Sequence, residues 1–523
     1  MAGTARRAQR PGTGGGGDQR LRATPALVWA LVGVHGLAMV LASVLYPTYR
    51  APDEGAHVDM VLLLAGGAGY PDVGERQLSR RMLDSQLLVG HDRTGERTPL
   101  EAGDAPPRDD RPRFADLGPD VPSDVPQQMA AHPPLYYVAA ATTLSAVMAL
   151  LPEGTGLSFD QVVGFLRLFG ALLFLPLPLL AYRAAQRLAA PASVAVTAAV
   201  LPLGIPQLTH IGASVNNDTL LVALLAVLTL PTLAAARGDT GGRTALVAGL
   251  VGGLALLTKG FALVVPVWLA GVYLLGAARG GGARAVGAGA IALLTATGVG
   301  GWWWIRNLST FGTVQPSGLP SPPSPAGFVP DVGAWLVFFV RRMSVRFWIE
   351  PDVLPEGAPP LDLVATFVVV ACGVAAFVGY RHIRQQPADL AVLLAPLAGL
   401  AAIVVFGAWR VYARTGTPFA VHGRYLYGGV VGLGVVAAFG AWALLRQRGP
   451  WLPLVAFVVA AAVQVTAMAL ALTEYWAPPG LGGRTAAVLA WAPWPVPVVV
   501  GAALGAVALA IWTVAALVRE SRA

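Results

Sequence analysis

Apolar runs of about twenty residues recur along the whole chain, and they constrain its fold more than any other feature. A helix rises about 1.5 Å per residue, so such a run spans the roughly 30 Å hydrocarbon core of a bilayer. Of the 523 residues, 55% are hydrophobic and 12% are charged, and a soluble fold could not bury that much apolar surface. We therefore predict an all-α integral membrane protein with about 12–13 transmembrane helices. The runs lie near 26–46, 133–151, 163–182, 192–210, 217–236, 244–258, 260–278, 285–305, 361–380, 388–409, 425–445, 450–473 and 497–518.

Arginine clusters between the runs indicate which runs cross the membrane, because short cytoplasmic loops are rich in arginine. If the run at 133–151 lies along the outer interface, all the clusters fall on the cytoplasmic side together with the amino terminus. If that run crosses, every cluster moves outside. We therefore predict an interfacial helix at 133–151, which Pro133 and Pro134 would begin. The clusters are 182–187, 237–243, 278–284, 381–384, 446–448 and 518–522.

This topology predicts three parts of the chain in the plasma membrane. Residues 1–25, rich in glycine and arginine, form a disordered cytoplasmic tail. Residues 26–445 form a transmembrane module whose outer loops are 47–161 and 306–360, and residues 446–523 add further transmembrane helices. The functional face is predicted to be extracytoplasmic.

Charge and motifs exclude several classes of function. The net charge of +8 comes from arginines that flank apolar runs, so it indicates anchoring to the bilayer and not binding to nucleic acid. The sequence has no Gly-x-Gly-x-x-Gly, P-loop, Cys-x-x-Cys or His-Glu-x-x-His motif. Its single cysteine, Cys372, allows no intramolecular disulfide. No predicted inner loop is long enough to fold as a nucleotide-binding domain.

Polar and ionisable residues gather at the predicted outer ends of the helices. Such residues are costly near a bilayer, so they indicate a functional site. That face has no access to nucleotide sugars or ATP, and a polyprenyl-phosphate-linked sugar is a donor that the cell can deliver there. Its phosphate needs cations, and the acceptor hydroxyl needs a carboxylate base. The residues are Asp53, Glu54, His57, His132, Asn216, Asn217, Asp218, Lys259, Arg306, His422, Arg424 and Tyr425.

The stretch "APDEGAH" has two interpretations. Pro52 followed by Asp53 and Glu54 is typical of a helix start, where the macrodipole favours acidic residues. Alternatively, Asp53 and His57 share one helical face and suit a base with its orienting partner, or part of a divalent metal site. One Asp–His pair does not specify a metal, which needs three or four protein ligands.

The remaining candidates also have a structural alternative. Lys259 is the only lysine and suits a phosphate as a point charge, unless it simply snorkels at a helix end. The Asn216–Asp218 segment is either a helix cap or a ligand for hydroxyl groups. Arg306 binds phosphate or ends its helix at the interface. Arg341, Arg342, Arg346 and Trp348 favour an amphipathic interfacial helix.

Six segments carry a resemblance to a known family: "APDEGAH", "HPPLYY", "SVNNDTL", "LTKG", "WWWIRN" and "HGRYLYG", in this order. The sequence resembles a family of bacterial multi-pass membrane proteins catalogued as a domain of unknown function, over roughly residues 26–445. That family looks related to the GT-C glycosyltransferases, which include protein mannosyltransferases and lipid A aminoarabinose transferases. The resemblance implies a GT-C-like bundle with juxtamembrane helices in the first outer loop. It also implies that Asp53, beside Glu54, binds acceptor or metal or acts as base, and that Lys259 and Arg424 contact the donor phosphate.

Together these observations predict a membrane glycosyltransferase. It would move a sugar from a polyprenyl-phosphate donor to an outer-face glycan, glycolipid or protein. The alternatives are a transporter or lipid flippase, or a non-catalytic scaffold. The predicted roles are catalysis or a divalent metal for Asp53, Glu54 and His57; phosphate binding for Lys259, Arg424 and Arg306; and acceptor or sugar binding for His132, Asn216, Asn217, Asp218, His422 and Tyr425.

Overall fold

The computed structural model describes residues 25–92, 96–152, 155–319, 323–384, 387–419, 421–445 and 449–522. The predicted tail lies outside the described residues except for its last position, Pro25, and so does the cationic cluster 446–448. The described residues form an all-α integral membrane protein with one small sheet.

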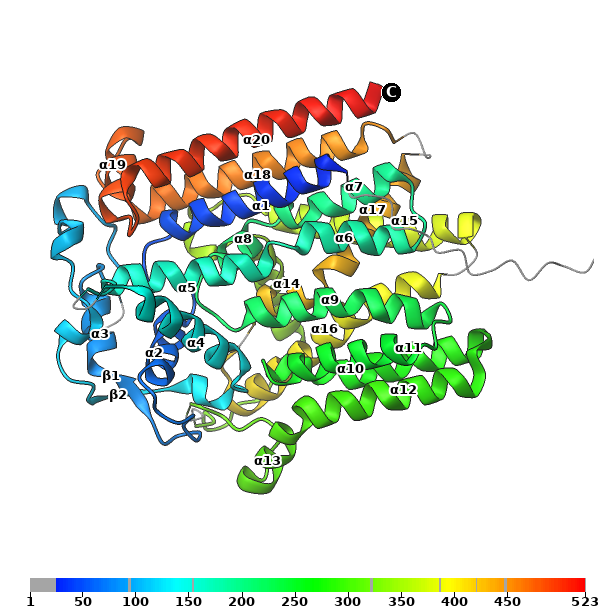
Figure 1. Cartoon of the computed structure of the whole chain (residues 1–523), viewed down its shortest axis with the longest axis horizontal. Coiled ribbons are helices and arrows are strands. Elements are labelled where there is room, and N and C mark those ends of the chain that lie inside the picture. The colour runs from blue at the N-terminus through cyan, green and yellow to red at the C-terminus, as the bar shows by residue number, and fades with distance from the viewer. Residues whose placement is uncertain are drawn as a thin grey trace, which may run out of the picture.

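Long helices run side by side through the body of the molecule (Figure 1). By length and hydropathy, nine helical segments of the described residues could cross a membrane, or ten if the bent pair α7–α8 is one crossing. One segment, Gly260–Phe311, folds back at Gly280 into an antiparallel pair, and α10 is a shorter apolar helix. The described residues therefore contain twelve candidate crossings if the two arms of Gly260–Phe311 are counted separately and α10 is added to the ten. The bundle helices are α1 (Ala26–Leu45), α5 (Phe159–Phe174) with α6 (Leu177–Arg187), α7 (Ala192–Val200) with α8 (Pro206–Gly212), α9 (Asp218–Ala236), α10 (Gly242–Leu256), α11 (Val264–Gly276), α12 (Gly282–Ala296), α15 (Leu361–Arg384), α16 (Ala388–Thr415), α17 (Val430–Leu444), α18 (Leu452–Tyr475) and α20 (Val496–Arg522).

Small residues and prolines shape the packing of these helices. Gly432 and Gly440 of α17 lie against the backbones of Leu393 and Cys372, where a Cβ would overlap a carbonyl oxygen. Such positions let apolar helices approach closely within a bilayer. Between α7 and α8 the axis bends by 68°, and Ile205, which precedes a proline, is extended at the bend.

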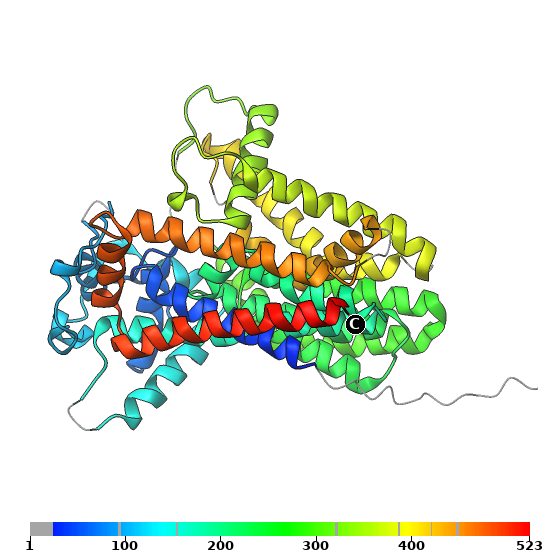
Figure 2. The same ribbon diagram turned by 90° about the horizontal axis from the view of Figure 1, so that it is seen from above.

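One end of the bundle is covered by the shorter elements (Figures 1 and 2), and we call it the site end. The first outer loop contributes a two-stranded antiparallel sheet, with Gln77 paired to Pro126 and Ser79 to Pro122. The elements that cover this end are α2 (Glu54–Ala65), β1 (Gln77–Ser79), α3 (Arg80–Leu87), β2 (Pro122–Pro126), α4 (Leu135–Leu150) and α19 (Leu481–Trp491), with the short turn η4 (Gln128–Ala131). Nearer the middle of the long axis in Figure 1 lie α13 (Trp302–Phe311) and α14 (Val332–Trp348). Further short turns are η6 (Gly260–Leu263), η9 (Pro351–Val353) and η10 (Gly423–Gly429).

Helix α4, the predicted interfacial helix, does not cross the bundle. At its start the Leu135 N–H donates to Leu257 O, at the site end of α10. After it, the Phe159 N–H donates to Pro112 O in the first outer loop. The chain therefore enters and leaves α4 at the same end, in agreement with the interpretation of the arginine pattern.

The opposite end carries the short cationic loops. Asp389, buried at the start of α16, accepts from Arg279 at 2.6 Å and lies 3.5 Å from Arg237. Two of the predicted arginine clusters thus meet at one carboxylate. The carboxy-terminal helices belong to the same body, because α20 packs along α1 and Leu100 exchanges backbone hydrogen bonds with Tyr475 and Ala477.

Candidate functional site

Asp53 lies in the turn between α1 and α2. Tyr49 and Asp53 both have a left-handed backbone there, with φ of 66° and 62°, which costs a non-glycine residue on the order of 1 kcal/mol. Asp53 occupies the N-cap position of α2, but its side chain makes no capping hydrogen bond. It accepts instead from Gln128 and from Arg424, each at 3.0 Å. The helix-start interpretation therefore does not account for this side chain.

Arg424 of η10 connects Asp53 to the middle of the chain. One terminal nitrogen donates to Asp53, and Nε lies 3.6 Å from Asp218 Oδ2. Gly423 permits this approach, because a Cβ there would overlap the backbone of Phe347. Burial would raise the pKa of Asp53, but the Arg424 guanidinium and the smaller contributions that accompany it outweigh burial and lower the pKa to about 2. Asp53 is therefore ionised at physiological pH.

Lys259 and Asp218 form the second ion pair, with 2.7 Å between Nζ and Oδ1. Both side chains are buried, so Lys259 does not snorkel into solvent, and burial lowers its pKa. The ring of Tyr425 lies 5.4 Å from Nζ and 5.5 Å from the Arg424 guanidinium carbon. Asp53, Arg424, Asp218 and Lys259 thus form a connected group of two carboxylates and two cations, which we call the ionic quartet.

Two histidines adjoin the quartet. His57 is buried and hydrogen-bonded through Nδ1 to the Tyr137 hydroxyl at 2.9 Å, and burial lowers its pKa well below the usual value. His132 follows η4, and its buried Nδ1 has no partner among the described residues. Burial, with a contribution from Lys259, lowers the pKa of His132 to about 3. Both rings are therefore neutral at physiological pH and can donate or accept one hydrogen bond at each nitrogen.

His422 brings a third cation, Arg346, to the quartet. Arg346 of α14 donates to His422 Nδ1 at 2.7 Å, and His422 precedes Arg424 by two residues. Burial and the neighbouring Arg424 lower the pKa of His422 to about 2, so the ring is neutral. The sequence pattern favoured an amphipathic interfacial role for Arg346. Its spacing of four from Arg342 places two cations on one helical face, but that spacing also fits an amphipathic helix, so the sequence does not single out Arg346.

Asn216 and Asn217 differ in their surroundings. Asn216 Oδ1 accepts from the Thr219 N–H at 3.3 Å, and its amide donates to Ile211 O, so it caps the start of α9 as the structural alternative predicts. Asn217 is fully buried, and neither its Oδ1 nor its Nδ2 has a partner among the described residues. Because unsatisfied buried amides are rare, Asn217 is the stronger candidate for a ligand contact.

Glu54, which we predicted to act beside Asp53, is occupied elsewhere. Arg167 donates to both of its oxygens, at 2.8 and 2.6 Å, and the backbone N–H groups of Tyr49 and Val215 donate at 2.8 and 3.0 Å. Four donors leave this buried carboxylate no free position for an acceptor hydroxyl. Its geometry is that of a structural ion pair that fixes the turn after α1.

Arg306, which we predicted to bind phosphate, also has a different partner. Its guanidinium pairs with Asp72 of the first outer loop and lies 5.3 Å from the Trp303 ring. It contacts none of the ionic quartet in the described structure. Arg306 therefore joins α13 to the first outer loop.

The donor set does not fit the predicted metal site. In the described part of the chain, no group of three or more His, Cys, Asp or Glu side chains could hold a metal ion. Glu54 is saturated by nitrogen donors, and Arg424 already neutralises Asp53. A divalent cation would therefore find two protein ligands beside existing positive charges, which disfavours its binding.

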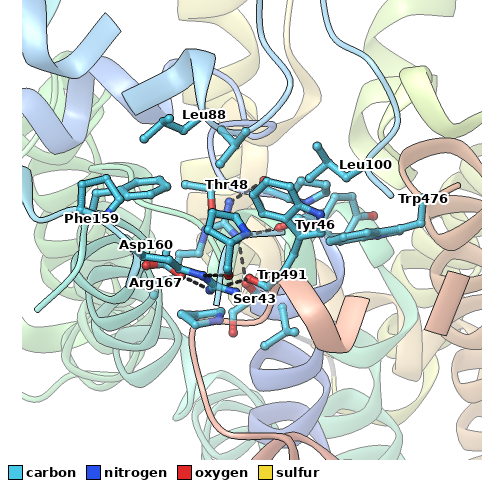
Figure 3. A pocket seen from close by; sticks show the side chains of 18 residues that line it. Ser43, Tyr46, Thr48, Leu88, Leu100, Phe159, Asp160, Arg167, Trp476 and Trp491 are labelled. Atoms are coloured by element: carbon cyan, nitrogen blue, oxygen red, sulfur yellow. Dashed lines mark hydrogen bonds and ion pairs between the residues drawn. The ribbon is translucent and has the colours of Figure 1, made fainter. Parts of the chain in front are cut away.

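A separate cavity of about 40 Å³ lies between the first outer loop and the carboxy-terminal helices (Figure 3). It has room for about three water molecules, which is too little for a sugar. Its charged lining residues are Arg111, Asp160 and Arg167, which are already paired, and none of the ionic quartet lines it. We therefore place the candidate site at the quartet and not at this cavity.

The sequence profile of one family, described as "Predicted membrane protein (DUF2142)", matches residues 37–433. The chain belongs to this DUF2142 family. A comparison with curated proteins finds no match. The matched region of the DUF2142 profile contains every residue of the ionic quartet and also Arg346.

Solved structures similar to this DUF2142 protein include ArnT from Cupriavidus metallidurans bound to undecaprenyl phosphate. The identity is 15%, the TM-score is 0.44, and the match covers 95% of this chain and 78% of that chain. Another is the Archaeoglobus fulgidus oligosaccharyltransferase tethered to an acceptor peptide, with 11% identity, a TM-score of 0.42, and coverage of 87% and 56%. Likenesses at these values do not define an activity, which depends on the side chains of the site.

Proposed function

We propose that this protein is a membrane glycosyltransferase that moves a sugar from a polyprenyl-phosphate donor to an acceptor hydroxyl at the site end. The observation that carries the proposal is the ionic quartet, whose members come from four distant parts of the chain. Asp53 is the one member with an accessible side chain, 37% exposed. An ionised carboxylate that is open on one side and held by a guanidinium on the other suits an acceptor hydroxyl.

In this proposal the acceptor oxygen attacks the anomeric carbon of the donor sugar. The bond between that carbon and the phosphate oxygen breaks, and the phosphate leaves with the electron pair. The acceptor proton passes to Asp53, whose Oδ1 and Oδ2 are held by Gln128 and Arg424. Arg424 and Lys259 hold the two carboxylates of the quartet in place.

The neighbouring polar groups suit the sugar. Among the described residues, the Asn217 amide and the His132 Nδ1 have no hydrogen-bond partner, and both kinds of group bind sugar hydroxyls. Positive charge in the short loops at the opposite end supports a cytoplasmic position for that end. The site end would then face the extracytoplasmic side, to which a polyprenyl-linked sugar is delivered.

Mass spectrometry of lipid-linked sugars and envelope glycans, with and without the protein, tests the proposal. Cells without the protein should accumulate one lipid-linked sugar and lose one glycan modification. Asp53→Asn should reproduce that loss, because an amide cannot accept the proton. Asp72→Asn is the matched control, since it neutralises an aspartate of the same outer loop that lies outside the quartet. Normal glycans in the Asp53→Asn strain would remove Asp53 from the mechanism.

A further inference from the structure

The charges of the ionic quartet compensate one another. Lys259 lies 2.7 Å from Asp218, and Arg424 lies 3.0 Å from Asp53 and 3.6 Å from Asp218. Two carboxylates and two cations give no net charge. An anionic phosphate that bound to Lys259 or Arg424 would compete with a carboxylate already in contact. The resemblance-based assignment of the phosphate to these two residues therefore faces an electrostatic obstacle.

Arg346 has no such compensation. It forms no ion pair with any Asp or Glu of the described chain, and its one side-chain partner is the neutral ring of His422. Its Nε is buried and has no hydrogen-bond partner in the described structure. A guanidinium with an unused donor beside a buried site is a ready ligand for phosphate, which it can bind in a bidentate manner.

Other cations crowd Arg346. Arg342 lies one helical turn earlier on α14, and Arg424 follows His422 by two residues. Burial lowers the pKa of Arg346, and the charges of Arg342 and Arg424 lower it further. Glu350 and Asp352 act in the opposite direction, but neither forms an ion pair with Arg346. No carboxylate of the described chain forms an ion pair with the Arg346 guanidinium, so its charge and its free Nε–H are left for an anionic ligand.

We propose that Arg346, held by His422, is the phosphate-binding residue of the donor site, and that its ligand is the phosphate of a polyprenyl lipid. This inference rests on the proposed function and specifies where its donor is held. The His422 ring lies 5.4 Å from the Tyr425 ring, which also faces Lys259 and Arg424. A phosphate at Arg346 therefore lies beside the quartet without displacing its carboxylates.

Binding of undecaprenyl phosphate and of undecaprenol to the purified full chain, titrated by native mass spectrometry, tests this assignment. Wild type should prefer the phosphorylated lipid. Arg346→Gln should weaken undecaprenyl phosphate binding roughly ten- to hundredfold, the value of one charge-assisted hydrogen bond, and leave undecaprenol unchanged. Arg346→Lys should recover part of the affinity, because it keeps the charge but not the fork. Arg341→Gln is the matched control, since it removes an exposed arginine from the same helix.

The variants distinguish this inference from the proposed function. If Arg346→Gln keeps the preference while Lys259→Gln loses it, the phosphate lies at the quartet and the inference is overturned, although the donor class stands. If wild type does not distinguish the two lipids, the donor class fails as well. Inorganic phosphate is the third probe. If inorganic phosphate displaces undecaprenyl phosphate only at more than about a hundredfold excess, the result supports a lipid phosphate as the ligand of Arg346. If it displaces the lipid at equal concentration, the ligand is not specifically a lipid phosphate.

Discussion

The ion pair of Glu54 and Arg167 tests whether Glu54 has a structural role while the adjacent Asp53 takes part in the reaction. Glu54→Gln keeps the shape of the side chain but replaces one acceptor oxygen with an NH₂ group. The carboxylate accepts two hydrogen bonds from Arg167 and two from backbone N–H groups. The new NH₂ group must therefore face donors, and the Arg167 guanidinium is left buried without its counter-charge.

The size of the effect follows from this geometry. Breaking a buried ion pair by removing one partner costs about 3–5 kcal/mol. A cooperative unit of 523 residues, at about 2.1 cal/mol/K per residue, has an unfolding entropy near 1.1 kcal/mol/K. The melting temperature of the purified chain should therefore fall by about 3–5 °C. Differential scanning fluorimetry in detergent measures this shift.

Asp53→Asn is the matched comparison, because the adjacent carboxylate is partly exposed and makes two hydrogen bonds. It should change the melting temperature by less than about 1 °C while abolishing transfer. Glu54→Gln should retain transfer in proportion to the folded fraction. A Glu54→Gln protein with unchanged melting temperature and no transfer would refute the reasoning and return Glu54 to the reacting groups.

Further variants test the rest of the site. Lys259→Met should lower the melting temperature by a few degrees and abolish transfer, because it leaves the Asp218 carboxylate buried with Arg424 3.6 Å away; Lys259→Arg should recover part of the stability. The pKa of His132, lowered to about 3, means that the unfolded chain binds the extra proton below pH 6.5 while the folded chain does not. The free energy of unfolding should therefore fall as the pH drops from 6.5 towards 3, by up to about 1.4 kcal/mol per pH unit. In His132→Gln, chemical denaturation at several pH values should show a smaller change of this free energy with pH. Gly423→Ala should reduce transfer about a hundredfold in a glycan assay with little loss of protein, because its Cβ would push η10 from Phe347.

Much of the fold was predictable because membrane insertion depends on local hydropathy. The apolar runs correspond to the observed helices, and α4 lies at the site end, apart from the crossing helices. The side of the membrane that the arginine clusters indicate stays a prediction. Hydropathy alone did not predict the bend at Ile205, where one run becomes two helices, although Pro206 is a local signal for it. Local patterns could not predict that Gly260–Phe311 ends in α13, which turns away from the bundle (Figure 1).

The candidate site was predictable in part. The predicted topology places four helix ends on the same side of the membrane. It therefore predicts that the residues at these ends lie close together: Asp53, Asp218, Lys259 and Arg424. The choice between Asp53 and Glu54 depends on the left-handed turn at Asp53, which directs neighbouring carboxylates to different partners. The choice between Arg306 and Arg346 depends on which part of the second outer loop packs against η10. Neither the turn nor that packing leaves a pattern in the sequence.

The neutrality of the quartet bears on how the proposed reaction would begin. A pKa of about 2 makes Asp53 a weak proton acceptor while Arg424 holds it. A donor phosphate beside Arg346 would add negative charge near Asp53 without supplying a new cation. A like charge raises the pKa of a carboxyl group, so donor binding would move Asp53 towards the range in which it accepts a proton. Acceptor activation would then depend on prior binding of the donor, and water that reached an empty site would meet a carboxylate too weak to activate it.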